Sequence, residues 1–247
     1  MTKPKNIIPE NLERLHNAEE QLREKAFGIV GDHETLHRHI AVVEAAMDLT
    51  DIFRQFDTND ENLKVLQILG MRTFNAFGAS MKLSLSGYHQ NSALILRDIL
   101  ETVFLLNLFV QDPPLIERWR LADKKERMAQ FSPLKVREAL DSRDGFTSKR
   151  RFEIYELFSE LAGHPNMKSA WMMRPQKDGD AVIGPFMEAT ALEAVVSEMG
   201  RLAIQVGEQI NAAIDPLWSP ALPSRASFAK LKLEWLSTFY PDAQNWK

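Results

Sequence analysis

Apolar residues recur along most of this chain at spacings of three and four, which is the period of an amphipathic α-helix. The predicted helices cover residues 10–27, 33–56, 61–86, 88–110, 115–122, 133–140, 148–161, 189–214 and 227–239. The segment 88–110 is the most apolar of these, yet it carries Arg97, Asp98 and Glu101. Charged residues inside an apolar stretch favour the buried central helix of a bundle over a membrane span.

One segment departs from the helical pattern. In "AWMMRPQKDGDAVIGPF", residues 170–186, two short apolar runs flank an Asp-Gly pair, as in a β-hairpin. We therefore predict an all-α fold, a multi-helix bundle with a small β-hairpin insertion near residues 170–186. Because the helices have short links, we expect 1–247 to form a single domain. Its core bundle would span about 10–214, followed by a Pro-rich loop and short helix over 215–247.

Composition narrows the function classes. The chain of 247 residues contains no cysteine, which excludes disulfides, thiolate metal sites and cysteine nucleophiles. Its formal net charge of -4 gives no overall attraction to nucleic acid or anionic lipid. No apolar run follows the basic residues near the N-terminus, so we expect a cytoplasmic protein that is neither secreted nor bound to a membrane.

The stretch "GDHETLHRH" contains HExxH, the zinc signature of metalloproteases. On one helix, His33 and His37 would share a metal ion and Glu34 would activate its water, which would make the protein a metal-dependent hydrolase. The surroundings argue against this. The residue after the second histidine is the charged Arg38, and Glu44 lies two turns further along the same helix, too far to be a third ligand.

A second metal hypothesis pairs two ExxH segments, Glu13 with His16 and Glu34 with His37, as in four-helix di-iron bundles. Those sites also need a bridging carboxylate from each of two other helices, and the sequence offers Glu101 without a clear second. We therefore expect no metal and no other cofactor.

Basic residues are concentrated in residues 115–151, which contain eleven Lys or Arg against six Asp or Glu. Such a segment could bind the phosphates of RNA, with Trp119, Phe131 and Phe152 stacking on bases. The alternative, which we favour, is a solvated face of short helices.

The strongest candidate site is polar and lies on the most apolar predicted helix. Arg97 and Glu101 are four residues apart, so they share a helix face, and a partly buried guanidinium needs acceptors. Candidate partners from the rest of the chain are Tyr88, His89, Tyr155 and His164. We expect Arg97, Glu101 and His164 to lie close in space, and we favour a satisfied polar network that fixes the register of the helices over a functional site.

The segments "GYHQNSALILRDILE", "YELFSELAGHPN" and "GPF" resemble a bacterial family of uncharacterised α-helical proteins. That resemblance covers the central part of the chain and implies a helical fold without implying an activity. The chain also resembles, distantly, the HEPN superfamily, whose ribonucleases use Arg-x(4 to 6)-His. None of the six histidines here has an arginine at that distance, so a nuclease would need Arg97 and His164 from different helices.

These observations favour a ligand-binding or protein-interaction module. The alternatives are a HEPN-like RNA-binding or RNA-cleaving defence or toxin protein and the metal-dependent hydrolase. The C-terminal stretch is more apolar than a free tail should be, since it contains Trp218, Trp235, Phe239 and Tyr240. We therefore predict a homodimer, unless these aromatic residues pack on their own chain.

Overall fold

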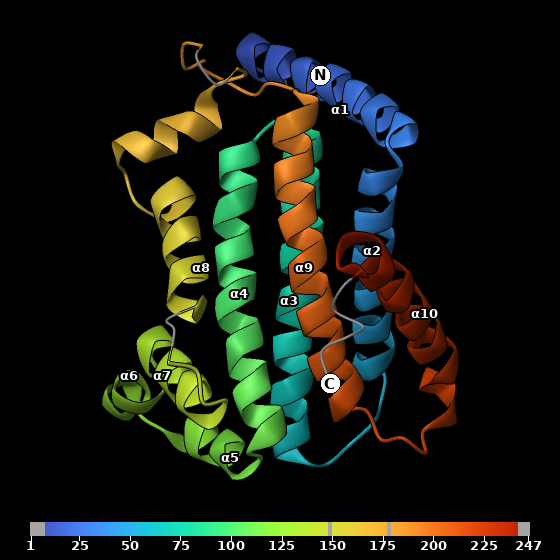
Figure 1. Ribbon diagram of the computed structural model, residues 1–247, viewed down its shortest axis with the longest axis vertical. Helices are drawn as coiled ribbons and strands as arrows, with labels where there is room; N and C mark the ends of the chain where they lie inside the picture. Colours follow the sequence, from blue (N-terminus) through green and yellow to red (C-terminus); the bar gives the residue numbers. More distant parts are fainter. Residues whose placement is uncertain (1–7, 148–149, 177–178, 242–247) are drawn as a thin grey trace, which may run out of the picture.

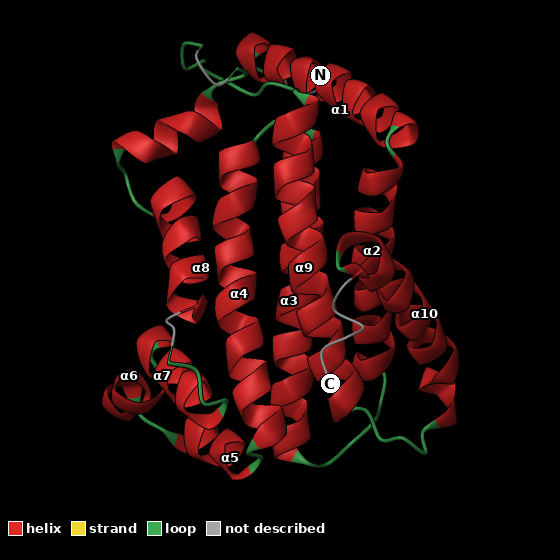
Figure 2. Cartoon of the chain, in the orientation of Figure 1, coloured by secondary structure: helices red, strands yellow, loops and turns green. Residues whose placement is uncertain are grey.

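The computed structural model describes residues 8–147, 150–176 and 179–241, and these form ten α-helices and three shorter helical turns. The α-helices are α1 (Glu10–Asp32), α2 (Glu34–Arg54), α3 (Glu61–Leu85), α4 (His89–Gln111), α5 (Pro114–Leu121), α6 (Lys124–Phe131), α7 (Pro133–Arg143), α8 (Arg150–Phe158), α9 (Ala189–Ala213) and α10 (Leu222–Phe239). The shorter turns are the π-helical η1 (Ser159–Gly163) and the 3₁₀-helical η2 (Met167–Met173) and η3 (Ser219–Ala221). Helices and loops alone make up the described chain in Figure 2, which confirms the all-α prediction.

Four long helices, α2, α3, α4 and α9, lie side by side at the centre of the molecule (Figure 1). Each contributes fully buried apolar side chains to one hydrophobic core, including Leu49, Phe77, Leu96 and Val206. Helix α4 contacts α3, α9, α7 and α8, so it is enclosed on several sides. This explains why its sequence is apolar around most of its circumference.

The other helices surround this bundle (Figure 1). Helix α1 crosses one end, α5 to α7 lie at the opposite end, and α10 packs beside α2. Helix α8 runs along the outer side of α4, and it leads directly into η1, which also contacts α4. The junction of α4, α7, α8 and η1 is where the candidate site lies.

The predicted β-hairpin near residues 170–186 is wrong. Residues 167–173 form η2, whose first turn is capped by the Asn166 side chain accepting from the amides of Lys168 and Ser169. The capped amides and the backbone groups of the helical turn that follows form local hydrogen bonds. They are therefore not available to pair with a second strand. Two backbone hydrogen bonds join residues 170–176 to residues 179–186, from the Val182 amide to the Met173 carbonyl and from the Gly179 amide to the Gln176 carbonyl, both at 3.0 Å. The second closes a local turn, and the described residues of this segment form no strand. Asp178 of the expected turn lies outside the described residues.

The C-terminal aromatic residues pack on their own chain. Trp235 is buried against α2, and the Trp218 ring lies 5.0 Å from the ring of Phe56. The feature that motivated the homodimer is therefore accounted for within one chain, and the dimer stays a prediction. None of the helices in the described ranges combines the length and apolar character needed to cross a bilayer.

Candidate functional site

Arg97 lies at the junction of α4 with α8. Its Nη2 donates to the hydroxyl of Tyr155 on α8, and the guanidinium carbon lies 4.8 Å from the centre of the Tyr155 ring. The carboxylate of Glu101, one turn along α4, lies 3.4 Å from the same Nη2. The side chains of Arg97 and Glu101 remain 21% and 30% exposed. The structure thus brings together three of the six predicted residues, Arg97, Glu101 and Tyr155.

A second arginine, which the sequence did not single out, joins them. The guanidinium carbon of Arg137 on α7 lies 3.9 Å from the centre of the Tyr155 ring, closer than that of Arg97. Arg137 is only 5% exposed. Two guanidinium groups therefore share one aromatic ring, and a cation stacked on tyrosine is attracted by the negative face of the ring. We call Arg97, Glu101, Arg137 and Tyr155 the arginine cluster.

The arginine cluster holds more donors than acceptors. Nε of Arg97 and both Nε and Nη1 of Arg137 are buried without a hydrogen-bond partner among the described residues. The cluster contains two permanent positive charges and one carboxylate, that of Glu101, whose 3.4 Å contact with Arg97 is longer than a normal hydrogen bond. Buried donors without acceptors each cost folding free energy of about 1–3 kcal/mol, so the cluster has the composition of an anion site.

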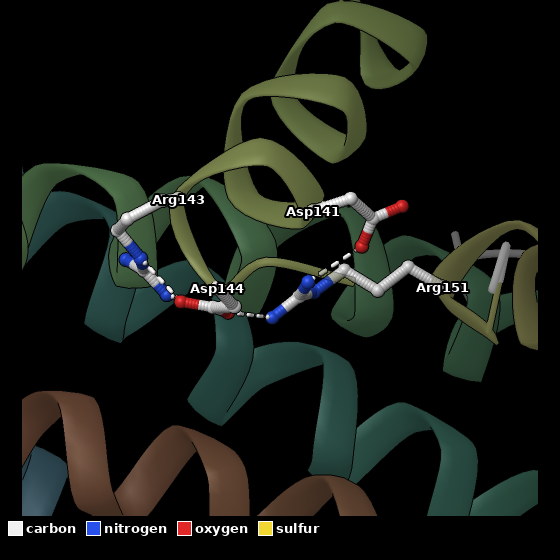
Figure 3. A network of polar contacts seen from close by, with 4 residues as sticks. All are labelled: Asp141, Arg143, Asp144 and Arg151. Carbon is white, nitrogen blue, oxygen red and sulfur yellow. Dashed lines mark hydrogen bonds and ion pairs between the residues drawn. The ribbon is translucent and has the colours of Figure 1, made fainter. Parts of the chain in front are cut away.

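An ion-pair network beside the cluster fixes α8 on α7 (Figure 3). Arg151 lies between two acidic residues, Asp141 and Asp144, and Arg143 donates to Asp144 through both Nε and Nη2. The hydrogen bond from Arg143, supported by that from Arg151, lowers the pKa of Asp144 to about 2. Asp144 is therefore an anion at neutral pH and keeps both arginines engaged.

The network and the cluster form two successive levels of one helix contact. Arg137 and Asp141 are one turn apart on α7, and Arg151 and Tyr155 are one turn apart on α8. Arg137 meets Tyr155 while Asp141 meets Arg151, so the two helices run antiparallel. This pair of four-residue spacings is the signal in the sequence that could have identified Arg137.

His164 follows Gly163, which lies against Arg97, but the His164 side chain is not part of the arginine cluster. A Cβ on Gly163 would lie 2.8 Å from Nη1 of Arg97, so the lack of a side chain at Gly163 leaves room for the guanidinium in its present position. The His164 side chain is exposed, and among the described contacts it makes no hydrogen bond or ion pair to Arg97 or Glu101. The expected link between His164 and the arginine therefore stays a prediction.

Tyr88 and His89 belong to another site, at the start of α4. The Tyr88 hydroxyl donates to Glu19 on α1 at 2.8 Å, and burial together with that carboxylate raises its pKa to about 12. His89 is buried, which lowers its pKa to about 4, and its Nε2 lies 3.1 Å from the carbonyl of Phe186. A carbonyl only accepts, so Nε2 carries the proton. Both residues hold the loop before α9 and helix α1 against the bundle.

The HExxH segment does not lie on one helix. His33 has an extended backbone and is the N-cap residue between α1 and α2, whereas Glu34 and His37 lie on α2. Helix α1 continues to Asp32, five residues beyond its predicted end. Glu34 forms an ion pair with Arg38. In the described ranges no three His, Asp or Glu residues are grouped as metal ligands, and the hydrolase stays a prediction.

The charges of the basic segment 115–151 are partly neutralised within it. Lys135 pairs with Glu138, and Arg143 and Arg151 are engaged in the network of Figure 3. Trp119 lies under the guanidinium of Arg127 at 5.6 Å. An RNA-binding role for this segment stays a prediction.

Comparison of the chain with protein-family models, curated proteins and solved structures found no match. The resemblance of its central part to a bacterial helical family, and the more distant HEPN-like character, stay predictions.

Proposed function

We propose that the protein is a ligand-binding module for an anion, whose acidic group binds at the arginine cluster. One observation carries this proposal: Arg97 and Arg137 stack on the same tyrosine with three buried donors unsatisfied, and among the ion pairs of the described residues the carboxylate of Glu101 contacts Arg97 alone. Guanidinium groups match carboxylate and phosphate oxygens with paired hydrogen bonds. A bound anion would supply the missing acceptors.

The surrounding contacts support preorganisation of this site. Tyr155 is held by two arginines and by the ion-pair network between α7 and α8, and Arg97 is held against the backbone of Gly163. Neither guanidinium needs to be ordered when the ligand binds, which lowers the entropic cost of binding. Arg97 and Glu101 are exposed enough for a ligand to reach this edge from solvent.

Binding of inorganic phosphate and of acetate, measured by titration calorimetry, tests the proposal. We expect Arg137→Gln to weaken binding by at least tenfold, since one charge-assisted hydrogen bond is worth about 1.5–3 kcal/mol. Lys135→Gln is the matched control, because Lys135 lies on the same helix and pairs with Glu138 on the surface. The proposal would be overturned if neither phosphate nor acetate binds, or if the two variants lose affinity equally.

Glu101 provides a test in the opposite direction. Its carboxylate competes with the ligand for Arg97, so Glu101→Gln should tighten anion binding severalfold. Glu61→Gln is the control, since Glu61 forms an ion pair on another helix, with Lys64 of α3. Weaker binding in Glu101→Gln would mean that this carboxylate contributes to the site in another way.

RNA is a second candidate ligand, favoured by the position of exposed His164 next to Gly163, which contacts Arg97. A phosphodiester on the arginine cluster would then lie near an imidazole able to transfer protons. Incubation with single-stranded RNA tests this: cleavage that is lost in both His164→Ala and Arg97→Gln would replace the anion-binding proposal by a ribonuclease. Intact RNA that binds with a steep salt dependence would indicate a binding role.

A further inference from the structure

A cavity of about 440 Å³ adjoins the arginine cluster. It lies between α3, α4, α5 and the junction of α6 with α7, and most of its wall is apolar. Its main apolar side chains are Ile68, Leu69, Phe104, Leu105, Trp119 and Phe131. This volume is in the range of small-molecule sites in proteins, and an apolar wall with few polar groups is typical of them.

Glu101 connects the cavity to the cluster. Its side chain lines the cavity, and its carboxylate lies 3.4 Å from Nη2 of Arg97. On the α7 side, Val136 lines the cavity and its chain neighbour Arg137 stacks on Tyr155. A ligand whose acidic head binds the arginines would therefore have an apolar cavity next to that head. Helices α4 and α7 contribute residues to both the cluster and the cavity.

From this continuity we infer that the ligand is an amphipathic organic acid. Its carboxylate or phosphate binds the arginine cluster, and its apolar body fills the cavity beside Trp119 and Phe131. The inference rests on the proposed function, and it adds the class of ligand. The wall favours an apolar body, because its aromatic and branched side chains offer apolar surface. The same cavity also contains polar groups, those of the ion pair between Arg72 and Asp98.

The chemistry of the walls also limits the body of the ligand. Thr102 donates its hydroxyl to the backbone carbonyl of Asp98 at 2.8 Å, so this donor is already used. Arg72 and Asp98 neutralise each other. A body rich in hydroxyl groups, such as a sugar, would lose its hydrogen bonds to water without finding partners on the apolar wall. An alkyl chain or an unsubstituted aromatic ring meets this wall without that loss.

The test compares ligands that differ only in head or body, by titration calorimetry on the full chain. Inorganic phosphate carries the head alone and acetate the head with one methyl group, hexyl phosphate and heptanoate carry the same hexyl body, and hexanol carries that body without the charged head. Each buried methylene should improve affinity about fourfold, so hexyl phosphate should bind at least a hundredfold more tightly than inorganic phosphate. Its binding should show a more negative heat-capacity change. Comparison of the phosphate and carboxylate series shows which of the two acidic groups the arginine cluster binds more tightly.

Two variants place the gain in the cavity. Ile68→Trp puts a larger side chain at a half-exposed position of the wall, so it should remove most of the hundredfold gain while leaving binding of inorganic phosphate intact. Met71→Trp is the matched control, since Met71 is exposed on the same helix and does not line the cavity. Its gain should remain.

The possible failures are distinguishable. If phosphate or acetate binds but the alkyl chain adds no affinity, or if Ile68→Trp keeps the gain, the inference is wrong and the anion site stands. Tight binding of hexanol, equal to that of hexyl phosphate, would likewise overturn it, because the head would be unnecessary. If none of the charged probes binds, the proposed function itself fails.

Discussion

Two junctions of this molecule bury polar side chains in opposite ways. Where α10 packs on α2, the Trp235 indole donates to Nδ1 of His39 at 2.8 Å, and both residues are nearly inaccessible. Where α7 and α8 pack on α4, Arg97 and Arg137 are held on Tyr155 with three donors unsatisfied. Burial is common to both, so burial alone does not identify a site. Unsatisfied hydrogen-bonding capacity is what separates them.

The α2–α10 junction is electrically neutral. Indole only donates, so Nδ1 of His39 accepts and the neutral ring carries its proton on Nε2. Burial, with a smaller effect of Arg201, lowers the pKa of His39 to about 4, which keeps it neutral at pH 7. A Cβ on Gly200 would lie 2.8 Å from that Nδ1, so a glycine makes room for this pair, as Gly163 does for Arg97.

The largest expected effect concerns stability at the satisfied junction. Trp235→Ala should lower the free energy of unfolding by about 3–5 kcal/mol, because it removes a buried indole and leaves Nδ1 of His39 without a donor. Urea unfolding measures the change. Trp171→Ala is the matched control: Trp171 is 62% exposed and should change stability little. Equal losses would show that burial of Trp235 does not hold α10.

The second expected effect is a loss of stability in mild acid. Burial lowers the pKa of both His39 and His89 to about 4, so the unfolded chain binds protons that the folded chain does not. The contribution of these histidines should be constant above about pH 7 and fall as the pH decreases from about 6.5 toward 4, by about 2 kcal/mol per histidine at pH 5. Asp144 does not contribute there, since its pKa is lowered to about 2 and it loses stabilisation only in stronger acid.

Urea unfolding at pH 7 and pH 5 checks this dependence, and His39→Gln sharpens it. Glutamine retains an acceptor for the Trp235 indole but does not titrate in this range. The variant should therefore lose about half of the pH dependence while His89 supplies the rest. A pH dependence equal to that of the unmodified chain would mean that His39 can be protonated without disturbing α10.

A smaller effect is expected for the network that supports the arginine cluster. Arg151→Gln removes the contacts with Asp141 and Asp144 (Figure 3) and should lower stability by about 1–2 kcal/mol, since the Arg151–Asp141 pair is largely buried. The pKa of Asp144 should rise, which NMR titration detects. Arg150→Gln, at the exposed neighbouring position, is the control. If both variants behave alike, the network does not position α8.

The contrast between the junctions also explains what the sequence could predict. The Arg97–Glu101 pair follows from a four-residue spacing on an apolar helix, and the structure confirms that ion pair. The long helices were similarly accessible, because their signals are local, but α6 (Lys124–Phe131) was not predicted and α10 begins at Leu222 instead of residue 227. Arg137 was counted within the basic segment, since its contact with Tyr155 depends on how α7 folds back on α8. Likewise, nothing local in the sequence indicates that His39 meets Trp235, 196 residues away.

Two sequence patterns lack the backbone conformation that they suggest, for the same physical reason. The apolar alternation of residues 170–186 suggested strands, but the Asn166 cap and a helical turn satisfied the backbone locally. The HExxH spacing suggested a metal pair on one helix, but a break between α1 and α2 falls at His33. In both segments the residues have the expected spacing in the sequence. The backbone conformation that this spacing requires, strands in one segment and a single continuous helix in the other, is not formed. A short motif is informative only together with its structural context.

The smallest expected change in stability is also the one with the opposite sign. Arg137→Met removes a buried guanidinium with two unpartnered nitrogens and replaces it by a long, unbranched apolar side chain on the Tyr155 side of α7. Replacing an uncompensated buried charge by an apolar group of similar reach is often neutral or stabilising, so we expect a gain of about 1 kcal/mol in anion-free buffer. Phosphate should stabilise the unmodified chain and leave the variant unchanged, because only the unmodified site binds it. Thermal unfolding with and without phosphate measures both effects. A loss of several kcal/mol would instead show that Arg137 is held by favourable contacts, like Trp235, and that the arginine cluster serves the fold rather than a ligand.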